Sequence, residues 1–75
     1  MLEDLNNGEI LRKLAVTRMP FGKYEGTLLI DLPGDYLVWF EKQGFPRGEL
    51  GQLLALAYEI DLYDLQPLVE GLKPQ

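Results

Sequence analysis

The sequence has no cysteine, no histidine and no serine, and Thr17 and Thr27 are its only residues with an aliphatic hydroxyl group. Catalysis by an activated serine or cysteine therefore lacks its usual nucleophile and its usual histidine base. Without cysteine and histidine, the chain also lacks the common ligands of a zinc site and cannot form a disulfide. We therefore expect a protein that is not an enzyme and that binds no metal or other cofactor.

The sequence also lacks any long apolar run. No segment approaches the roughly 20 apolar residues that a membrane-spanning helix needs. Residues 1–7 are acidic, whereas a secretory signal peptide begins with basic residues and continues with an apolar stretch. These absences predict a cytoplasmic protein that does not bind membranes.

With 75 residues, 47% of them hydrophobic, the chain is expected to form one small domain over residues 1–75. We expect residues 1–7 to be flexible. A domain of this size buries only about 60–65% of the surface that its unfolded chain exposes, so its stability as a monomer should be modest. The sixteen leucines can supply either a well-packed core or an interface between two copies.

Charge is unevenly distributed along the chain, whose formal net charge is −5. Residues 1–32 carry four basic and five acidic side chains, whereas residues 33–75 carry three basic and seven acidic ones. An acidic domain is repelled by nucleic-acid phosphates, so binding to nucleic acid is disfavoured. A basic corner in the first half keeps it as an alternative. This corner consists of Arg12, Lys13, Arg18 and Lys23.

The first half of the sequence predicts one short helix followed by a β-hairpin. Asn7 is a suitable N-cap for a helix over residues 8–15. In the strand that follows, Pro20 lacks the N–H group for a ladder hydrogen bond and therefore favours a sheet edge. A loop with a glycine at each end connects this strand to a β-branched, aliphatic return strand. The predicted strand, loop and return strand span residues 16–21, 22–26 and 27–30.

The second half predicts helices only. Pro33 suits the first turn of a helix, and Gly44 suits its left-handed end. Pro46 opens a further helix with an apolar stripe at i, i+3, i+4, i+7 spacing. A last helical segment over residues 61–72 is interrupted near Pro67. The stripe consists of Leu50, Leu53, Leu54, Ala57 and Ile60. The predicted fold is α+β, with one β-hairpin and three to four short helices around a single core.

Three motifs follow one another in the chain. They are Met-Pro-Phe-Gly-Lys-Tyr-x-Gly at 19–26, Leu-Pro-x-Asp-Tyr-Leu-x-Trp-Phe at 32–40, and Gly-Phe-Pro-x-Gly-x-Leu-Gly at 44–51. Together they resemble a small bacterial family of unknown function, whose members are named "putative quorum-sensing-regulated virulence factor". The resemblance covers about residues 8–72 and implies a fold but no mechanism.

A segment similar to the first two motifs is also joined to some proofreading-type exonuclease domains, so the resemblance implies a place near nucleic acid. The family commonly has a basic residue at the position of Glu25. This departure weakens a phosphate-binding interpretation of the loop in this chain.

The predicted hairpin loop is the first candidate site. Backbone N–H groups of Gly22 and Gly26, together with the ammonium group of Lys23, would form a cradle for an anion. We favour the simpler interpretation, in which both glycines close the turn and Lys23 is a solvated charge. The candidate contacts to an anion or a nucleic acid are Arg12, Lys13, Arg18, Phe21, Gly22, Lys23, Tyr24 and Gly26.

Five aromatic residues would form a platform on which single-stranded bases stack. Burial in the core is the more common role of aromatic residues in so small a protein, and we expect it above all for Trp39 and Phe40. The candidate platform consists of Phe21, Tyr24, Tyr36, Trp39 and Phe40.

A stripe of small residues in the third predicted helix, formed by Gly48, Gly51 and Ala55, is the second candidate site. Glycine in a helix costs up to about 1 kcal/mol relative to alanine, so two glycines in one helix suggest the close approach of another backbone. We favour packing within the chain. Contact between two copies is the alternative, and these three residues are then the candidates for self-association.

The third candidate is the carboxylate cluster of Glu59, Asp61 and Asp64. Paired carboxylates can act as acid and base or hold a divalent cation such as Mg²⁺ or Mn²⁺. Their spacing matches no metal-binding loop, and solvated surface charge is the simpler interpretation.

Taken together, the residues predict a small non-enzymatic interaction module that binds a partner protein or a second copy of itself. The alternative is an accessory domain that contacts nucleic acid through the basic and aromatic residues of the hairpin region. A carboxylate-based enzyme is the third hypothesis, and it requires Glu59, Asp61 and Asp64 to converge on one pocket.

Overall fold

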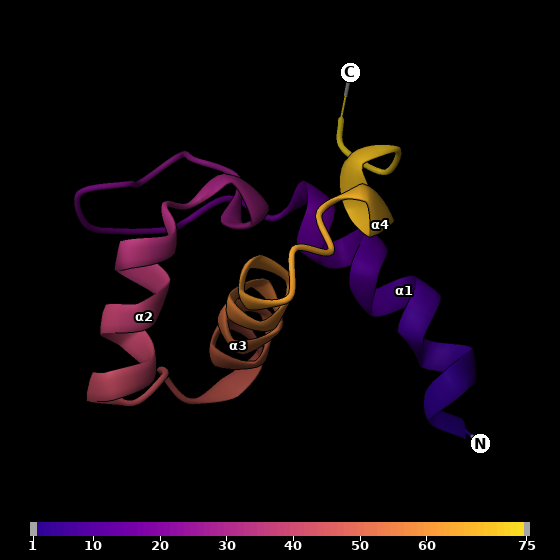
Figure 1. Ribbon diagram of the computed structural model, residues 1–75, viewed down its shortest axis with the longest axis horizontal. Coiled ribbons are helices and arrows are strands. Elements are labelled where there is room, and N and C mark those ends of the chain that lie inside the picture. The colour runs from indigo at the N-terminus through magenta and orange to yellow at the C-terminus, as the bar shows by residue number, and fades with distance from the viewer. Residues whose placement is uncertain (1, 75) are drawn as a thin grey trace.

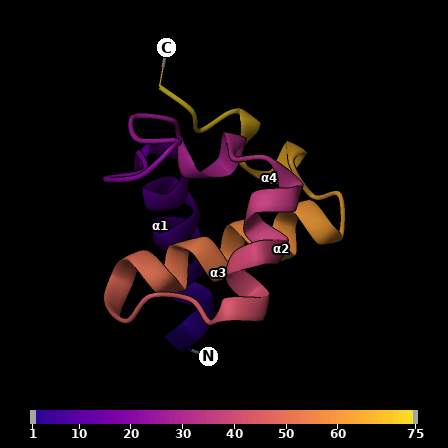
Figure 2. The ribbon, with the colours of Figure 1, turned by 90° about the vertical axis from the view of Figure 1, so that its left-hand side faces the viewer.

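The computed structural model describes the backbone of residues 2–74 and the side chains of residues 8–74. Its elements are α1 (Leu2–Val16), the 3₁₀ helix η1 (Leu29–Asp31), α2 (Gly34–Gln43), α3 (Gly48–Leu62) and α4 (Pro67–Glu70). Helix α3 lies in the middle, with α2 on one side and α1 on the other (Figure 1). The loop between α1 and η1 covers one end of this arrangement, and α4 packs against α1 (Figure 2).

The predicted α+β fold is wrong, because residues 2–74 contain helices but no β-strand or sheet. In place of the hairpin, the chain forms a loop over residues 17–28 in which one isolated antiparallel bridge joins Arg18 and Leu28. In the same loop, the N–H group of Met19 donates a backbone hydrogen bond of 2.8 Å to the carbonyl of Thr27. We call this segment the bridged loop.

The pairing cannot extend into strands because the chain turns on both sides of the bridge. On one side Pro20 lacks an N–H group, and the following residues form tight turns closed by bonds from Glu25 N to Gly22 O and from Thr27 N to Tyr24 O. On the other side the backbone coils into η1, where the N–H group of Asp31 bonds to the carbonyl of Leu28. The second half of the predicted return strand, residues 29–30, is therefore part of a 3₁₀ helix.

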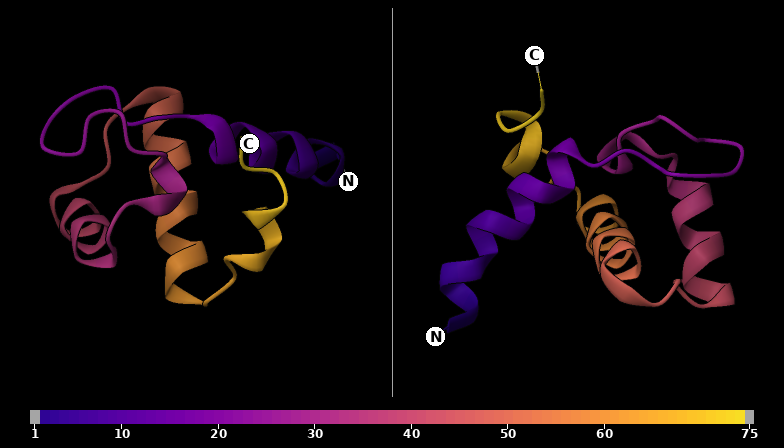
Figure 3. Two further views of the ribbon diagram at one scale, coloured as in Figure 1. Left: turned by 90° about the horizontal axis from the view of Figure 1, so that it is seen from above. Right: turned by 180° about the vertical axis from the view of Figure 1, so that it is seen from behind.

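Helix α1 begins at Leu2, six residues before the predicted start at Gly8. The predicted N-cap at Asn7 is therefore wrong, because this residue lies inside the helix. The N-terminal part of α1 extends beyond the rest of the bundle (Figure 3). The expected flexibility of residues 1–7 concerns side chains outside the described residues, and it stays a prediction.

The helices predicted for the second half are present. Helix α2 begins directly after Pro33 and ends at Gly44, which has a φ of 102° and donates its N–H group to the carbonyl of Phe40. Helix α3 buries the predicted stripe almost completely, with Leu50 only partly covered. These agreements follow from local signals, namely a proline at the start, a glycine at the end and a single apolar face.

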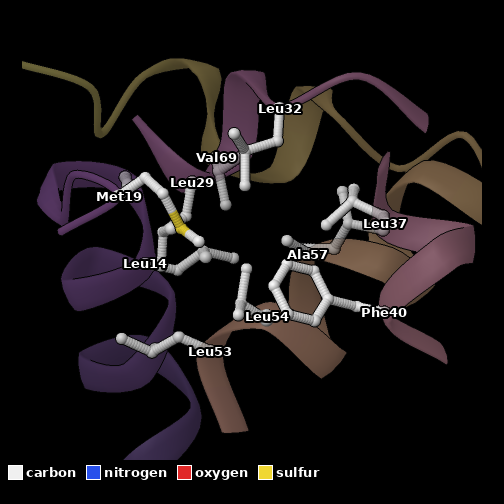
Figure 4. Close-up of a cluster of buried hydrophobic side chains, with 12 residues drawn as sticks. Leu14, Met19, Leu29, Leu32, Leu37, Phe40, Leu53, Leu54, Ala57 and Val69 are labelled. Carbon is white, nitrogen blue, oxygen red and sulfur yellow. The ribbon is translucent and has the colours of Figure 1, made fainter. Parts of the chain in front are cut away.

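One hydrophobic core joins all the elements (Figure 4). Leu54 of α3 is fully buried among side chains that come from every other helix and from the bridged loop. Met19 is 1% exposed and anchors the bridged loop to this core. The other labelled members are Leu14, Leu29, Leu32, Leu37, Phe40, Leu53, Ala57 and Val69.

The last helical segment, predicted over residues 61–72 with an interruption near Pro67, is divided between two helices. Helix α3 continues to Leu62, and a separate four-residue helix, α4, starts at Pro67. The predicted apolar side chains Leu65 and Leu68 lie largely in solvent, and Val69 is the residue that enters the core.

A Schellman-type turn ends α3. The N–H group of Leu65 bonds to the carbonyl of Ile60, and that of Asp64 bonds to the carbonyl of Asp61. Asp64 has a φ of 58°, the left-handed conformation that glycine adopts most easily. The backbone of Asp64 is therefore held in a conformation that costs an L-residue about 1–2 kcal/mol.

Replacing Asp64 with glycine is expected to raise the free energy of unfolding by about 0.5–1 kcal/mol, because glycine relieves this left-handed strain. Urea denaturation of both proteins measures the difference. Asp64→Ala is the matched control, since it removes the same charge but keeps a Cβ atom, and it should give no gain. An equal gain in both variants would attribute the effect to the charge and contradict the prediction.

Within the described part of the chain, no helix combines the length and the apolar character needed to span a bilayer. The expected cytoplasmic location stays a prediction.

Candidate functional site

The basic residues of the predicted corner lie on two different segments and have different partners. Lys13 on α1 forms an ion pair with Glu49 in the first turn of α3, with 2.6 Å between Nζ and Oε2. Arg18 donates a hydrogen bond of 2.8 Å to the carbonyl of Gly26 and so braces the bridged loop. The ammonium group of Lys23 lies 5.4 Å from the centre of the Tyr24 ring.

Arg12 lines a shallow groove between α1 and α3 with a volume of about 510 Å³. The charged side chains that line it have no net charge, because Arg12 and Lys13 are matched by Glu9 and Glu49. Lys23 belongs to the bridged loop, which extends away from α1 (Figure 1). The groove therefore brings together two of the four predicted cations, and Lys23 lies on another part of the molecule.

Two lysines have a pKa above the ordinary value of 10.5. The hydrogen bond with Glu49 raises the pKa of Lys13, and the hydrogen bond with Asp31 raises that of Lys73. Lys73 Nζ lies 2.7 Å from Asp31 and 3.5 Å from Glu70. Because a raised lysine pKa stabilises the fold only while the lysine is charged, these contributions are complete at neutral pH and are lost as the pH rises beyond that ordinary value.

The bridged loop uses its two glycines to close turns. Gly22 and Gly26 have φ values of 80° and 89°, which other residues rarely adopt. The N–H group of Gly26 bonds to the carbonyl of Met19 at 2.8 Å. That N–H group is therefore occupied within the chain, and this geometry favours the turn-closing interpretation over an anion cradle.

Four of the five predicted platform residues are in contact. The ring centres of Tyr24 and Tyr36 are 4.7 Å apart, and Tyr36 and Trp39 are almost parallel, with centres 6.3 Å apart and an angle of 2°. Phe40 packs edge-on against both Tyr36 and Trp39. The loop lies beside this cluster, because a Cβ atom on Gly22 would be 3.7 Å from the Tyr36 hydroxyl oxygen.

The expectation that Trp39 and Phe40 both belong to the core is correct only for Phe40. Phe40 is buried with Leu37, whereas Trp39 is 52% exposed. At 3.6 residues per turn, Trp39 lies about 200° around the helix from Leu37 and so faces away from the core. Phe21 on the bridged loop is also about half exposed. We call Phe21, Tyr24, Tyr36 and Trp39 the aromatic face.

The small-residue stripe has explanations within the chain. Gly48 has a φ of 84°, so it meets a conformational need at the start of α3. Gly51 is buried, and a Cβ atom there would overlap the carbonyl oxygen of Pro46. Ala55 lines a second shallow hollow of about 420 Å³ beside Ile10. The close approach inferred for Gly51 is therefore to the chain's own backbone, and self-association through the stripe stays a prediction.

The carboxylates Glu59, Asp61 and Asp64 are exposed at the end of α3. Asp61 reaches the start of α2, where its Oδ2 atom would lie 2.7 Å from a Cβ atom on Gly34. A carboxylate beside a helix N-terminus is favourable without any ligand. No group of three metal-ligating side chains that could hold an ion occurs among the described residues.

The sequence predictions missed one surface, where Leu62, Tyr63, Leu65 and Leu68 are all exposed around the turn between α3 and α4. We call these four residues the α3–α4 patch. The leucines of the patch recur every three residues, as on the buried face of a helix, and this spacing led to the wrong prediction that they are buried. Pro67 was the available signal, because a helix that restarts at a proline changes which side chains face inward.

Residues 7–72 of the chain match the model of the family described as "Putative quorum-sensing-regulated virulence factor". The chain belongs to this family. All the surfaces described above lie within the matched residues, apart from Lys73 and its ion pairs. The family resemblance of the three motifs is therefore confirmed.

Two relatives of this family member come from Escherichia coli, one from strain K12 and one from O157:H7. Each carries the name "Uncharacterized protein YpeB" and is 50% identical to the chain over 66 residues, which cover 87% of this chain and 92% of the relative. No solved structure matches the chain significantly.

Proposed function

We propose that this family member is a non-enzymatic interaction module that binds a partner protein through its aromatic face. The observation that carries the proposal is the exposure of Trp39, whose ring is held by Tyr36 and Phe40 but remains half open to solvent. Tryptophan and tyrosine are enriched at the residues that dominate binding energy in protein interfaces. A ring already held in place loses little conformational entropy when a partner covers it.

The state of the ionisable groups also supports binding over catalysis. No polar or charged side chain among residues 8–74 is buried. The two lysines with a raised pKa owe it to simple ion pairs at the surface. Catalytic acids and bases commonly sit in clefts that shift their pKa by burial. Turnover of any substrate by the pure protein would overturn this part of the proposal.

Cross-linking and co-purification from native cells, with mass spectrometry, test the proposed surface. We expect at least one protein to be captured by the wild type and lost with Trp39→Ala, because the variant removes the centre of the aromatic face. Val16→Ala is the matched control, since Val16 is similarly exposed but lies at the end of α1. Capture that is unaffected by Trp39→Ala would contradict the proposed surface.

The family name links its members to quorum sensing and virulence, and a binding role is compatible with both. The partner is either another protein or a second copy of the chain. Size-exclusion chromatography with light scattering separates the two, because a monomeric mass at micromolar concentration excludes a dimer. The single tryptophan adds a second readout, since its emission should shift to shorter wavelength when a partner covers it.

Binding to single-stranded nucleic acid is the second candidate function, and the almost parallel rings of Tyr36 and Trp39 favour it. Lys23 on the neighbouring loop would supply a phosphate contact. Fluorescence anisotropy with a single-stranded oligonucleotide should then show binding that weakens steeply as salt is added. An unchanged anisotropy at low salt would end this alternative.

A further inference from the structure

Among residues 8–74, the α3–α4 patch is the largest group of exposed apolar side chains that are close together in the sequence. Leu62, Tyr63, Leu65 and Leu68 are 56%, 65%, 41% and 56% exposed. Leu62 is the last residue of α3, Tyr63 and Leu65 lie on the turn that follows, and Leu68 lies in α4. Four large apolar side chains in solvent within seven residues are unusual for a surface that stays uncovered.

Backbone hydrogen bonds hold the patch in shape. The Schellman-type turn ties Leu65 to Ile60, and a further bond of 2.9 Å runs from the N–H group of Leu68 to the carbonyl of Leu65. Val69 is fully buried and fixes α4 to the core. With Val69 pointing inward, Leu68 is left in solvent. The exposure of the patch is therefore a property of the folded turn.

The rim of the patch is acidic. Glu59, Asp61 and Asp64 are exposed and adjoin the patch in the sequence, and a fourth exposed carboxylate, Glu70, is paired with Lys73. The sequence from Gly48 to Leu72 contains no lysine or arginine at all. The nearest cation in sequence is Lys73, and its ammonium group is already paired with Asp31 and Glu70. An apolar centre with an acidic rim is complementary to a partner that is apolar and basic.

Other occupants fit this surface less well. Symmetric contact with a second copy would bring two acidic rims together, which is electrostatically unfavourable. Nucleic acids and anionic membranes would be repelled by the same charges. Addition of a strand is not available, because residues 2–74 include no strand whose edge could pair with a peptide. A basic amphipathic helix avoids these problems, because it can cover an apolar surface without a strand edge and is attracted by acidic side chains.

We propose that the α3–α4 patch binds a cationic amphipathic helix of another protein. Leucine or aromatic side chains at i, i+3 or i+4, and i+7 of that helix would cover the patch, and flanking lysine or arginine side chains would face the acidic rim. This inference shares with the proposed function only the idea that the chain is a binding protein. It concerns a different surface and is tested by a different experiment.

The test uses the full chain and an amphipathic helical peptide built from leucine and lysine as the probe. Isothermal titration calorimetry measures the affinity, and ¹H–¹⁵N spectra show which amides shift. We expect the shifts to centre on residues 59–70. The double variant Tyr63→Ala/Leu68→Ala should weaken binding by about tenfold or more, the effect typical of removing central interface side chains.

Two controls make the result specific. Val16→Ala/Val38→Ala removes two aliphatic side chains that are exposed elsewhere, and it should leave the affinity unchanged. A second peptide with glutamate in place of lysine should bind about tenfold more weakly or not at all, because its charges face the acidic rim. The substituted side chains are exposed, so both double variants should remain folded, which circular dichroism can check.

Three outcomes would overturn the proposal. The first is the absence of measurable binding of the lysine peptide to the wild type. The second is equal weakening by the two double variants, or equal affinity for the two peptides. The third is a dimer in light scattering that Tyr63→Ala/Leu68→Ala dissociates, which would make a second copy the occupant. Failure of the Trp39→Ala capture experiment leaves this test unaffected, so the two proposals can be separated.

Discussion

Replacing Gly51 with alanine is expected to lower the free energy of unfolding by about 3 kcal/mol or more. A Cβ atom at this position would overlap the carbonyl oxygen of Pro46 and lie 2.7 Å from its carbon. Both atoms belong to the backbone that leads from α2 into α3, so relief requires a shift of that connection. A domain of this size has a total stability of only about 4–11 kcal/mol, so the variant should retain little folded protein on heating.

Thermal and urea denaturation monitored by circular dichroism measure this loss. Gly8→Ala is the matched control, because Gly8 lies in α1, is exposed, and has no atom within 4 Å of the position of its Cβ. It should raise the stability by about 0.5–1 kcal/mol, since alanine is the better helix former. If both variants were equally stable, the connection at Pro46 would have to move freely, contrary to the expected result.

Replacing Leu54 with alanine should cost about 2–5 kcal/mol of unfolding free energy. Leu54 is 0% exposed and lies in the core between α3 and the elements on both sides of it (Figure 4). The substitution removes buried apolar surface and leaves a cavity that the surrounding side chains can fill only in part. It should also weaken the contacts of α3 with α1 and α2 together, because all three helices share this core.

Leu62→Ala is the control for Leu54→Ala, since it makes the same chemical change at the end of the same helix, where the side chain is largely in solvent. Its effect on stability should stay within about 0.5 kcal/mol. Chemical denaturation of both variants under one set of conditions gives the comparison. A similar loss in both would show that Leu62 is covered in solution, which would contradict the exposure of the α3–α4 patch.

Local signals in the sequence were sufficient for α2 and α3. Pro33 and Gly44 mark the two ends of α2, and the stripe that contains Leu54 correctly identifies the buried face of α3. Such signals act within a few residues of one another, so they do not depend on the rest of the fold. The family resemblance was likewise carried by three contiguous motifs.

The hairpin prediction failed because pairing depends on what happens beyond the turn. Two glycines, a proline and a β-branched, aliphatic segment are compatible with either a hairpin or a loop held by one bridge. Met19 and Leu29 are both buried in the core, and the backbone near them forms turns and a 3₁₀ helix instead of two paired strands. No pattern within residues 16–30 specifies that both side chains find the same helices to pack against.

At the candidate sites too, the sequence identified the residues but not which of their side chains are buried. The sequence identified the residues of the aromatic face, but it placed Trp39 in the core beside Phe40, and it read the leucines around Pro67 as a buried face. In both cases two apolar residues are adjacent in a helix, and only one of the two side chains can point into the core. Phe40 and Val69 take that direction, while Trp39 and Leu68 are left in solvent.

By itself, the sequence determined that cysteine, histidine and serine are missing, and it determined the positions of α2 and α3. It could do so because composition and short-range periodicity are properties of the chain alone. Only the tertiary structure decided that the first half forms a bridged loop, that Gly51 lies under Pro46, and which apolar side chains remain outside. These features depend on segments that are distant in sequence and meet only when α3 packs between α1 and α2.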